Sequence, residues 1–392
     1  MEPGVASELE LTATAMASDG RAVGREESGR VVFVDGALPG ERVRARIGEQ
    51  RPRYASGDLV EVLEASRDRV EPRCRHLLQG CGGCQWQHVD PQAQRRFKAQ
   101  IILDALRRIA RIEPPALRPT VELPPWSYRT TLRAGVDADG RAGLRALRSN
   151  DLVNVPDCLV IHPLLAELLA DGRYLGAAEV IMRCGARTGE RLVATIPSGS
   201  PPQVPVDAVR SYFHEQAAGR LWRVSARSFF QTRPDGVDAL AALVETAAGE
   251  TGAPARALDL YSGVGLFAGV LAARGWAVTA VEGAAASVAD ARRNLRDLDV
   301  RVVRADLSGW RPEQRAELVV ADPSRAGLGR AGTEAVVASG AGRLVLISCD
   351  AGSLGRDAGL LRDAGYRLAS VTPVDLFPHT FHVEVVTVFE RT

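Results

Sequence analysis

The sequence lacks the features of a membrane or exported protein. Across 392 residues there is no unbroken apolar run of the roughly 18 residues that a membrane-spanning helix needs. The opening segment, MEPGVASELELTATA, is acidic and has no apolar centre of the kind found in signal peptides. These two absences predict a protein of the cytoplasm that has no membrane partner.

An excess of either charge is also absent. The chain has 49 Lys and Arg against 48 Asp and Glu, a net charge of +1, so any binding to nucleic acid must depend on local patches. Lys98 is the only lysine, and the remaining positive charge is arginine, which suits bidentate phosphate contacts and stacking on bases. At roughly 100–200 residues per domain, the length predicts two or three domains.

Residues 1–64 contain short alternating runs, such as GRVVFVDGALPGERVRARI and YASGDLVEVLEAS, separated by Gly and Pro turns. A period of two is typical of strands, and this pattern predicts a small antiparallel β-barrel. Barrels of this kind bind nucleic acid in some proteins and act as spacers in others. Periodicity alone does not decide between these two roles.

Residues 65–224 are expected to form a central domain of mixed but mostly β structure. The segment 91–112 has apolar residues at helical spacing and charged residues on its other face. From about residue 120, strand-like runs such as YRTTLRAGVDADGRAGLRAL alternate with turns.

Residues 225–392 alternate short apolar strands with helices, beginning with ALDLY and GLFAGVLAARG. This alternation predicts an α/β fold of the Rossmann-like class, with a parallel sheet and helices on both faces. The closing run YRLASVTPVDLFPHTFHVEVVTVFER has two strand-like parts without a helix between them, which predicts a final hairpin on the sheet.

A nucleotide-binding turn lies at the start of this third region. Gly263, Gly265 and Ala268 form a G-x-G-x-x-A pattern between a strand and a helix. Acidic residues end the following strands: Glu282, Asp306 and Asp322. Because the carboxyl ends of parallel strands share one rim, the acids should line one crevice, with Glu282 near ribose hydroxyls and Asp306 near an adenine amino group. Dinucleotide dehydrogenases share this pattern, and helix capping is the alternative role for the acids.

Cys349 ends another strand, beyond the apolar run LVLIS, and a helix is predicted to begin just after it. A lone cysteine is often a core residue. A position before a helix, however, is expected to lower the thiol pKa and to make the thiolate a nucleophile. Glu384, near His379 and His382, is either a base or a solvent-facing strand residue. Nucleophile, base and nucleotide crevice together are what a covalent group transfer needs.

Five segments resemble, in order and spacing, the motifs of the RNA uracil-C5-methyltransferases: DLYSGVGLFA, VEGAAASVADARRNL, ADPSRAGLG, SCDAGSLGRD and DLFPHTFHVE. RSFFQTRP resembles the motif that precedes the glycine turn in that family, and the N-terminal barrel resembles a TRAM domain. The resemblance implies methyl transfer from S-adenosylmethionine to carbon 5 of a uracil in folded RNA.

The resemblance also implies roles for individual residues. Cys349 is the nucleophile that adds to carbon 6 of the ring, and Glu384 is the base that removes the carbon-5 proton. The residues implied to contact S-adenosylmethionine are Gln231, Tyr261, Glu282 and Asp322. The chain departs from the family pattern at Ser324, where a second proline is usual, and at Asp350, where asparagine is common.

The cysteines predict a second site. Cys74, Cys81 and Cys84 fall within eleven residues, which in a cytosolic chain indicates metal or cluster ligation rather than disulfides. Cys158 is a candidate fourth ligand, and four thiolates suit either zinc or a [4Fe–4S] cluster. The ribosomal-RNA branch of the resembled family carries a [4Fe–4S] cluster on this pattern, with one residue fewer in the first gap. The resemblance therefore implies an iron–sulfur protein acting on 23S ribosomal RNA, whereas Cys184 is expected in the core.

Other functions remain open from the sequence. They are a transfer-RNA uracil methyltransferase, a non-catalytic RNA-binding or assembly factor with a methyltransferase fold, and a nicotinamide-dependent oxidoreductase. The oxidoreductase leaves Cys349, Glu384 and the cysteine cluster unexplained. A cytosine methylase usually has a Pro-Cys pair, and here Ser348 precedes Cys349. We expect a monomer that flips its target uracil out of the RNA. Candidates for stacking on RNA or adenine are Phe229, Phe230, Phe377 and Phe381.

Overall fold

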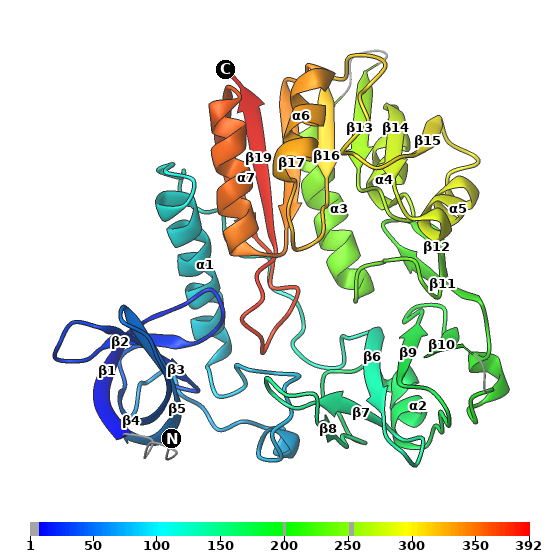
Figure 1. The fold of residues 1–392 in the computed structure, drawn as a ribbon. Helices are drawn as coiled ribbons and strands as arrows, with labels where there is room; N and C mark the ends of the chain where they lie inside the picture. Colours follow the sequence, from blue (N-terminus) through cyan, green and yellow to red (C-terminus); the bar gives the residue numbers. More distant parts are fainter. Residues whose placement is uncertain (1–7, 199–200, 251–254) are drawn as a thin grey trace.

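The computed structural model describes residues 8–198, 201–250 and 255–392. Figure 1 shows three parts: a barrel in blue, a central β region in cyan and green, and a large sheet flanked by helices. In this view the barrel and the central region lie below the large sheet, so the strand ends on one side of that sheet face both of them. Within the described ranges, no helix is long and apolar enough to cross a membrane.

The first part is the predicted barrel, closed in the strand order β1-β2-β3-β5-β4. Its inward side chains, such as Val32, Val34 and Val43, are fully buried. We predicted an antiparallel barrel. The prediction is wrong for one pair of strands, because β3 and β5 pair in parallel. That pairing skips β4 and is invisible to local alternation. Residues 1–7 of the predicted barrel lie outside the described residues. The strands are β1 (Glu8–Met16), β2 (Ala22–Arg25), β3 (Val31–Asp35), β4 (Arg42–Gln50) and β5 (Tyr54–Glu64).

The cysteine segment follows the barrel and leads into helix α1 (Pro91–Arg108) through the short turn η1 (Arg75–Leu77). The carboxylate of Asp90 caps α1 by accepting hydrogen bonds from the N–H groups of Gln92 and Ala93. The apolar face of α1, including Ile102 and Leu106, packs against the large sheet's helix α7 (Ala351–Asp363) rather than against the central sheet. This packing brings the cysteine segment beneath the large sheet (Figure 1).

The central region is a five-stranded sheet in the order β10-β9-β6-β7-β8, followed by a hairpin of β11 and β12. Its core includes Met182, Leu168 and Cys184, so Cys184 is a core residue, as expected. The elements are β6 (Thr131–Val136), β7 (Ala142–Arg145), β8 (Leu152–Val153), η2 (Pro163–Leu165), α2 (Ala166–Ala170), β9 (Glu179–Cys184), β10 (Arg191–Ile196), η3 (Val206–Ala208), β11 (Tyr212–Ala217) and β12 (Arg220–Ser225).

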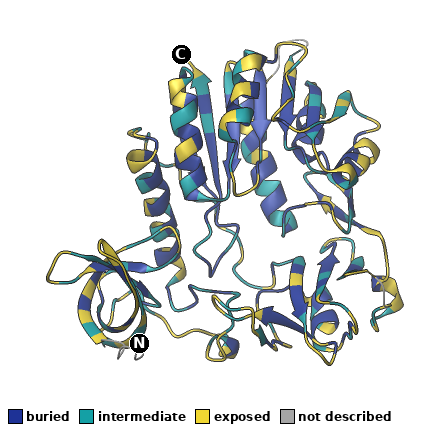
Figure 2. Cartoon of the chain, viewed as in Figure 1, coloured by how far each residue is buried: buried dark blue, intermediate teal, exposed yellow. Residues whose placement is uncertain are grey.

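The large sheet has seven strands in the order β15-β14-β13-β16-β17-β19-β18, and β17, β19 and β18 pair antiparallel at one end, which confirms the predicted final hairpin. Alternate residues of β17 join cores on opposite faces: Leu344 packs with α6 and α7, and Val345 with α3 and α4. Figure 2 shows the strands buried between these two helix layers. The elements are α3 (Pro234–Ala248), β13 (Arg256–Leu260), α4 (Leu266–Ala272), β14 (Ala277–Glu282), α5 (Ala285–Asn294), β15 (Val300–Arg304), β16 (Leu318–Ala321), α6 (Gly329–Ser339), β17 (Arg343–Ser348), β18 (Tyr366–Pro373) and β19 (Val385–Arg391).

The direction of the strands shows where the carboxyl ends of the parallel strands lie, and these ends are called here the rim. In Figure 1 the arrow of β19 points away from the barrel and the central region. The parallel strands run the opposite way, because β17 pairs antiparallel with β19. Their carboxyl ends therefore face the other two parts of the molecule.

Candidate active site

The glycine turn after β13 opens the rim. Gly265 is the N-cap of helix α4 and has a φ of +94°, a conformation that favours glycine. A Cβ there would also lie 2.5 Å from Cδ1 of Leu295, so that side chain would have to shift. Gly263 also has a positive φ of +55°, and its N–H donates a hydrogen bond of 3.0 Å to Glu282 Oε2. The turn is thus tied to the end of the neighbouring strand β14.

The acids of the rim differ in what holds them. Glu282 Oε1 accepts a hydrogen bond of 2.6 Å from the N–H of Ala284, so this carboxylate shapes its own turn as well as the glycine turn. Asp306 is exposed, and the backbone N–H of Ser308 lowers its pKa. Asp306 therefore accepts a hydrogen bond within its own turn, and among the described residues no helix begins there for it to cap.

Gln231 and Asp322 form a pair at the centre of the rim. Gln231 is buried, and its Nε2 donates a hydrogen bond of 3.1 Å to Asp322 Oδ2. Burial raises the pKa of Asp322 to about 7, and the hydrogen bond from Gln231 opposes the rise. Tyr261 lies beside them, with its hydroxyl donating to the carbonyl of Leu328 at 3.3 Å. The structure thus gathers Gln231, Tyr261, Glu282 and Asp322 on one rim.

Cys349 and Glu384 meet across neighbouring strands. Ser348, the last residue of β17, pairs with Val385, the first residue of β19. Cys349 and Glu384 are the next residues beyond this pair, although 35 positions separate them in sequence. Asp322 follows β16, which lies on the other side of β17. Nucleophile candidate, base candidate and Asp322 therefore come from three adjacent strands.

The electrostatics of the thiol contradict the expectation from its position before a helix. Burial raises the pKa of Cys349 to about 12, and the negative charges of Glu384 and Asp322 act in the same direction. Arg325 opposes them but does not compensate. The predicted lowering of this pKa is wrong because burial and two carboxyl groups outweigh the start of helix α7.

Glu384 is itself an unusual carboxyl group. It is almost fully buried, and burial, followed by the charge of Asp322, raises its pKa well above the usual range. Burial therefore disfavours the charged form of this side chain. His382 lies 3.3 Å from Arg325, and burial lowers the pKa of His382 to about 4. Arg325 was not singled out from sequence, although it lies inside the quoted motif ADPSRAGLG.

Three buried side-chain oxygens at the rim lack hydrogen-bond partners among the described residues. Among the described residues, Asp259 Oδ1, Ser262 Oγ and Ser348 Oγ are buried without a hydrogen-bond partner. These atoms lie at or next to the ends of β13 and β17. A polar ligand seated on the rim offers partners to such groups.

The four predicted ligand cysteines also come together. Cys74, Cys81, Cys84 and Cys158 line one small cavity, with Arg129 among its other lining residues, and all four thiols are free. Burial raises the pKa of Cys84 to about 11, and the charge of Arg129 opposes the rise. Within the described part of the chain, no three Cys, His, Asp or Glu side chains are close enough to hold a single metal ion.

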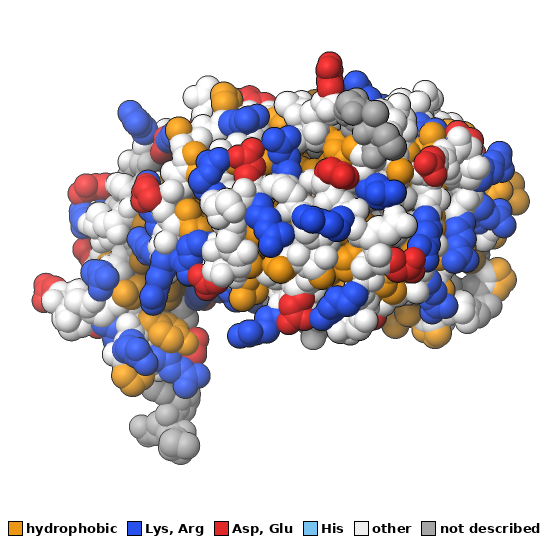
Figure 3. All heavy atoms as spheres, turned by 90° about the horizontal axis from the view of Figure 1, so that it is seen from above, with side chains coloured by type: hydrophobic (Ala, Val, Ile, Leu, Met, Phe, Trp, Pro, Cys, Tyr) orange, Lys and Arg blue, Asp and Glu red, His pale blue; other side chains and the backbone are white. Residues whose placement is uncertain are grey.

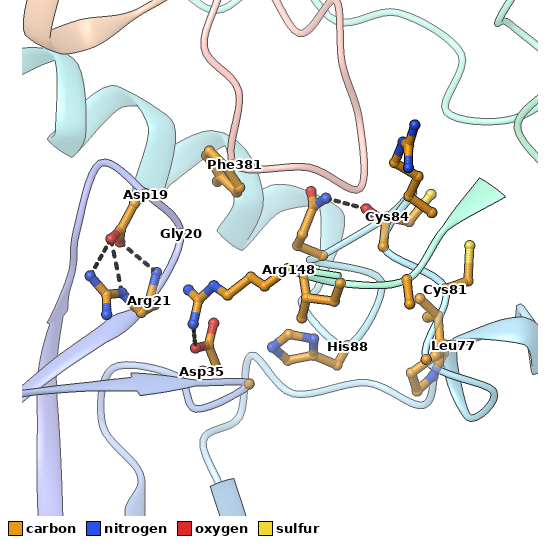
Figure 4. A pocket seen from close by; sticks show the side chains of 18 of the residues that line it. Asp19, Gly20, Arg21, Asp35, Leu77, Cys81, Cys84, His88, Arg148 and Phe381 are labelled. Carbon is orange, nitrogen blue, oxygen red and sulfur yellow. Dashed lines mark hydrogen bonds and ion pairs between the residues drawn. The ribbon is translucent and has the colours of Figure 1, made fainter. Parts of the chain in front are cut away.

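A larger cavity of about 810 Å³ separates the barrel from the cysteine segment. Figure 4 shows Arg21, Asp35, His88 and Arg148 around it, with Phe381 above. Arg148 forms an ion pair with Asp35 that joins the central sheet to the barrel. Figure 3 shows a different face, the end of the large sheet where the parallel strands begin, and there arginines and acidic residues are interspersed.

The four candidate stacking residues have different surroundings. Phe229 is 61% exposed, next to buried Phe230 and two residues before Gln231. Phe377 packs against the core on one face of the sheet, and Phe381 against the other. Phe229 is therefore the member of this set that is open for stacking beside the rim.

Known proteins match the chain over nearly its full length. The TRAM domain family matches residues 5–60. A Streptomyces avermitilis protein named as an uncharacterized RNA methyltransferase is 36% identical, covering 98% of this chain and 98% of its own. A Methylococcus capsulatus protein named 23S rRNA (uracil(1939)-C(5))-methyltransferase RlmD is also 36% identical, covering 96% of this chain and 95% of its own.

Among solved structures, Pyrococcus abyssi tRNA (uracil-54, C5)-methyltransferase in complex with S-adenosyl-L-homocysteine matches with a TM-score of 0.75. The match covers 97% of this chain and 100% of the other, at 21% identity. At this identity the likeness shows a shared fold.

Proposed function

Since this chain belongs to the RNA uracil-C5-methyltransferases and transfers methyl groups from S-adenosylmethionine to RNA, we propose that it forms 5-methyluridine at one position of 23S ribosomal RNA through a covalent adduct with Cys349. The observation that carries the mechanism is the meeting of Cys349, Glu384 and Asp322 at the ends of three adjacent strands. The relative from Methylococcus capsulatus supports ribosomal RNA over transfer RNA as the substrate.

The residues of the rim divide the reaction between them. The Cys349 thiolate adds to carbon 6 of the uracil, so that the electron pair of the ring double bond becomes available at carbon 5. Bound S-adenosylmethionine supplies an electrophilic methyl group to that carbon. Glu384 then takes the carbon-5 proton, the double bond re-forms, and the sulfur of Cys349 leaves with its electron pair.

The cofactor contacts follow from the rim. We assign them to Gln231, Tyr261, Glu282 and Asp322, and the unpartnered buried oxygens of Asp259 and Ser262 fit a polar ligand there. S-adenosylmethionine held by these residues would bring a positive charge to the rim, which would favour the thiolate of Cys349 against burial and the charges of Glu384 and Asp322.

We propose that Cys74, Cys81, Cys84 and Cys158 hold a [4Fe–4S] cluster. In such a cluster each thiolate binds a different iron, so the sulfurs lie further apart than around one zinc ion. The placement of all four free thiols around one cavity supports this proposal. The proposed reaction transfers no net electrons, so the cluster is structural or positions RNA.

The three predicted domains then have separate tasks. Residues 1–64 and 65–224 bind and orient RNA along the cavity lined by Arg21 and Arg148, and residues 225–392 carry out the reaction. We propose that the protein acts as a monomer in the cytoplasm and flips the target uracil toward Cys349.

The test is to map 5-methyluridine in total RNA from a strain that lacks this chain, and to restore the mark with purified protein and labelled S-adenosylmethionine. We expect one position in 23S ribosomal RNA to lose and regain the methyl group. Loss of 5-methyluridine from transfer RNA would show that transfer RNA is the substrate. Failure to transfer the methyl group to any RNA would contradict the proposed function.

A further inference from the structure

Glu384 stands at the end of a loop, residues 374–384, that joins β18 to β19 and is called here the Glu384 loop. In Figure 1 this loop extends from the sheet toward the cysteine segment. At its tip, His379 has a φ of +65°, a left-handed conformation that is uncommon for residues other than glycine. Such a conformation persists only where the surroundings hold it.

Gln94 of helix α1 holds the first side of that tip. Its Oε1 accepts a hydrogen bond of 2.7 Å from the N–H of His379. Its Nε2 donates to the carbonyls of Trp86 and Val89 at 3.0 and 2.9 Å. Gln94 is 1% exposed, so both ends of the amide are used inside the protein.

Trp86 holds the other side. Its backbone N–H donates to the carbonyl of His379 at 2.9 Å, so the polar groups on both sides of this left-handed residue are bound. The indole Nε1 donates to the carbonyl of Gly20, in a turn of the barrel, at 3.0 Å. Gly20 also packs on the Glu384 loop, because a Cβ there would lie 2.5 Å from Cδ1 of Phe381. Trp86 follows Cys84 by two residues, so the barrel, the cysteine segment, α1 and the Glu384 loop meet at one joint.

We infer that Gln94, acting with Trp86, is a positioning residue that sets the place of Glu384 for proton removal. The inference rests on the proposed function. Among the described residues, the hydrogen bonds of the Gln94 side chain go to Trp86, Val89 and His379, whereas Cys349 is held separately at the end of β17. Losing the joint should therefore slow removal of the carbon-5 proton more than it slows addition of the thiolate.

The experiment separates these two steps in the full-length protein. The substrate is total RNA from a strain lacking this chain, grown with [5-³H]uridine, so that proton removal releases tritium into water. Adduct formation is followed in parallel as RNA that remains bound to protein under denaturing conditions. The variants are Gln94→Leu, which removes both hydrogen-bonding ends, and Gln94→Glu, which keeps the acceptor for His379 but not the donor for Trp86 and Val89.

For Gln94→Leu we expect tritium release to fall roughly 10- to 100-fold, as for a modest misplacement of a reacting group. We expect adduct formation to change less than about threefold, so that adduct accumulates. Gln94→Glu should lie between this variant and the wild type. Gln100→Leu, at an exposed position of the same helix, is the matched control and should behave as wild type.

Equal loss of adduct formation and tritium release, or no change in either, would overturn the inference. If Gln94→Leu does not fold, by its thermal melting curve, Gln94→Glu decides in the same assay by the ratio of the two rates. A wild-type protein that methylates RNA without any adduct would instead refute the proposed chemistry, and so the two failures are distinguishable.

Discussion

Two regions of this protein are built around buried thiols, and their neighbours give the thiols different chemistry. At the rim of the large sheet, burial and the carboxyl groups of Glu384 and Asp322 raise the pKa of Cys349. In the cysteine cavity, burial raises the pKa of Cys81 and Cys84, while the charge of Arg129 opposes the rise. Burial thus disfavours the thiolate in both regions, but the neighbouring carboxyl groups at the rim add to this effect, whereas the charge of Arg129 in the cavity partly opposes it.

The largest expected effect is the loss of methyl transfer on replacing Cys349, compared with replacing the core residue Cys184. Cys349→Ala should lower methyl transfer by at least about 10³-fold, because the nucleophile is lost while the cofactor site remains. Cys184→Ala, at a buried core position, should keep the activity and lower the free energy of unfolding by roughly 1 kcal/mol. Labelled-methyl transfer and denaturant unfolding measure the two. Turnover by Cys349→Ala would contradict the assignment of the nucleophile.

Glu384→Gln tests the carboxyl group that faces Cys349. We expect product release to slow by roughly 10²- to 10⁴-fold, the usual range for a general base, and denaturation-resistant RNA adducts to accumulate. Gel analysis of labelled RNA after mixing with S-adenosylmethionine measures both. Normal release of methylated RNA would show that another group removes the proton.

The third prediction concerns the effect of a positively charged ligand on the pKa of Cys349. Below its pKa of about 12, the thiolate fraction of Cys349 rises about tenfold per pH unit, so alkylation at residue 349 should accelerate with pH over the whole neutral range. Sinefungin, which carries a cationic amine, should lower this pKa by about one to three units, and neutral S-adenosylhomocysteine should lower it less. Peptide mass spectrometry after brief iodoacetamide treatment follows the residue. Equal effects of the two ligands would show that charge does not activate the thiol.

The smallest expected effect belongs to the cysteine cavity. Arg129→Gln should raise the pKa of Cys81 and Cys84 further, and at neutral pH it should weaken iron binding several-fold, with recovery as the pH rises. Iron content after anaerobic reconstitution at several pH values measures this. Arg133→Gln, at an exposed ion pair with Glu179, is the control. A pH dependence identical to that of the wild type would remove Arg129 from this role.

Local patterns predicted much of the fold. Alternation of strands and helices from residue 225 led to the parallel sheet with its final hairpin, and period-two runs led to the barrel. They could not predict that β3 pairs in parallel with β5, or that α1 packs on α7, because these contacts join segments far apart in sequence.

The candidate site shows the same division. The resemblance to the motifs of the RNA uracil-C5-methyltransferases was enough to name Cys349, Glu384 and Gln231, which the structure places on one rim. It gave no sign of the Gln94–Trp86 joint, since a buried glutamine in a helix resembles an exposed one in sequence. The position before a helix gave the wrong direction for the pKa of Cys349, which depends on carboxyl groups from other strands.

The sequence by itself determined the residue types of the reaction and the strand ends that carry them, because side-chain periodicity and glycine turns are local properties. Only the tertiary structure decided which charges surround each thiol and what holds the Glu384 loop. Electrostatic and hydrogen-bonding effects depend on distance in space, and in this chain the deciding partners are separated by as many as 285 positions, as for Gln94 and His379.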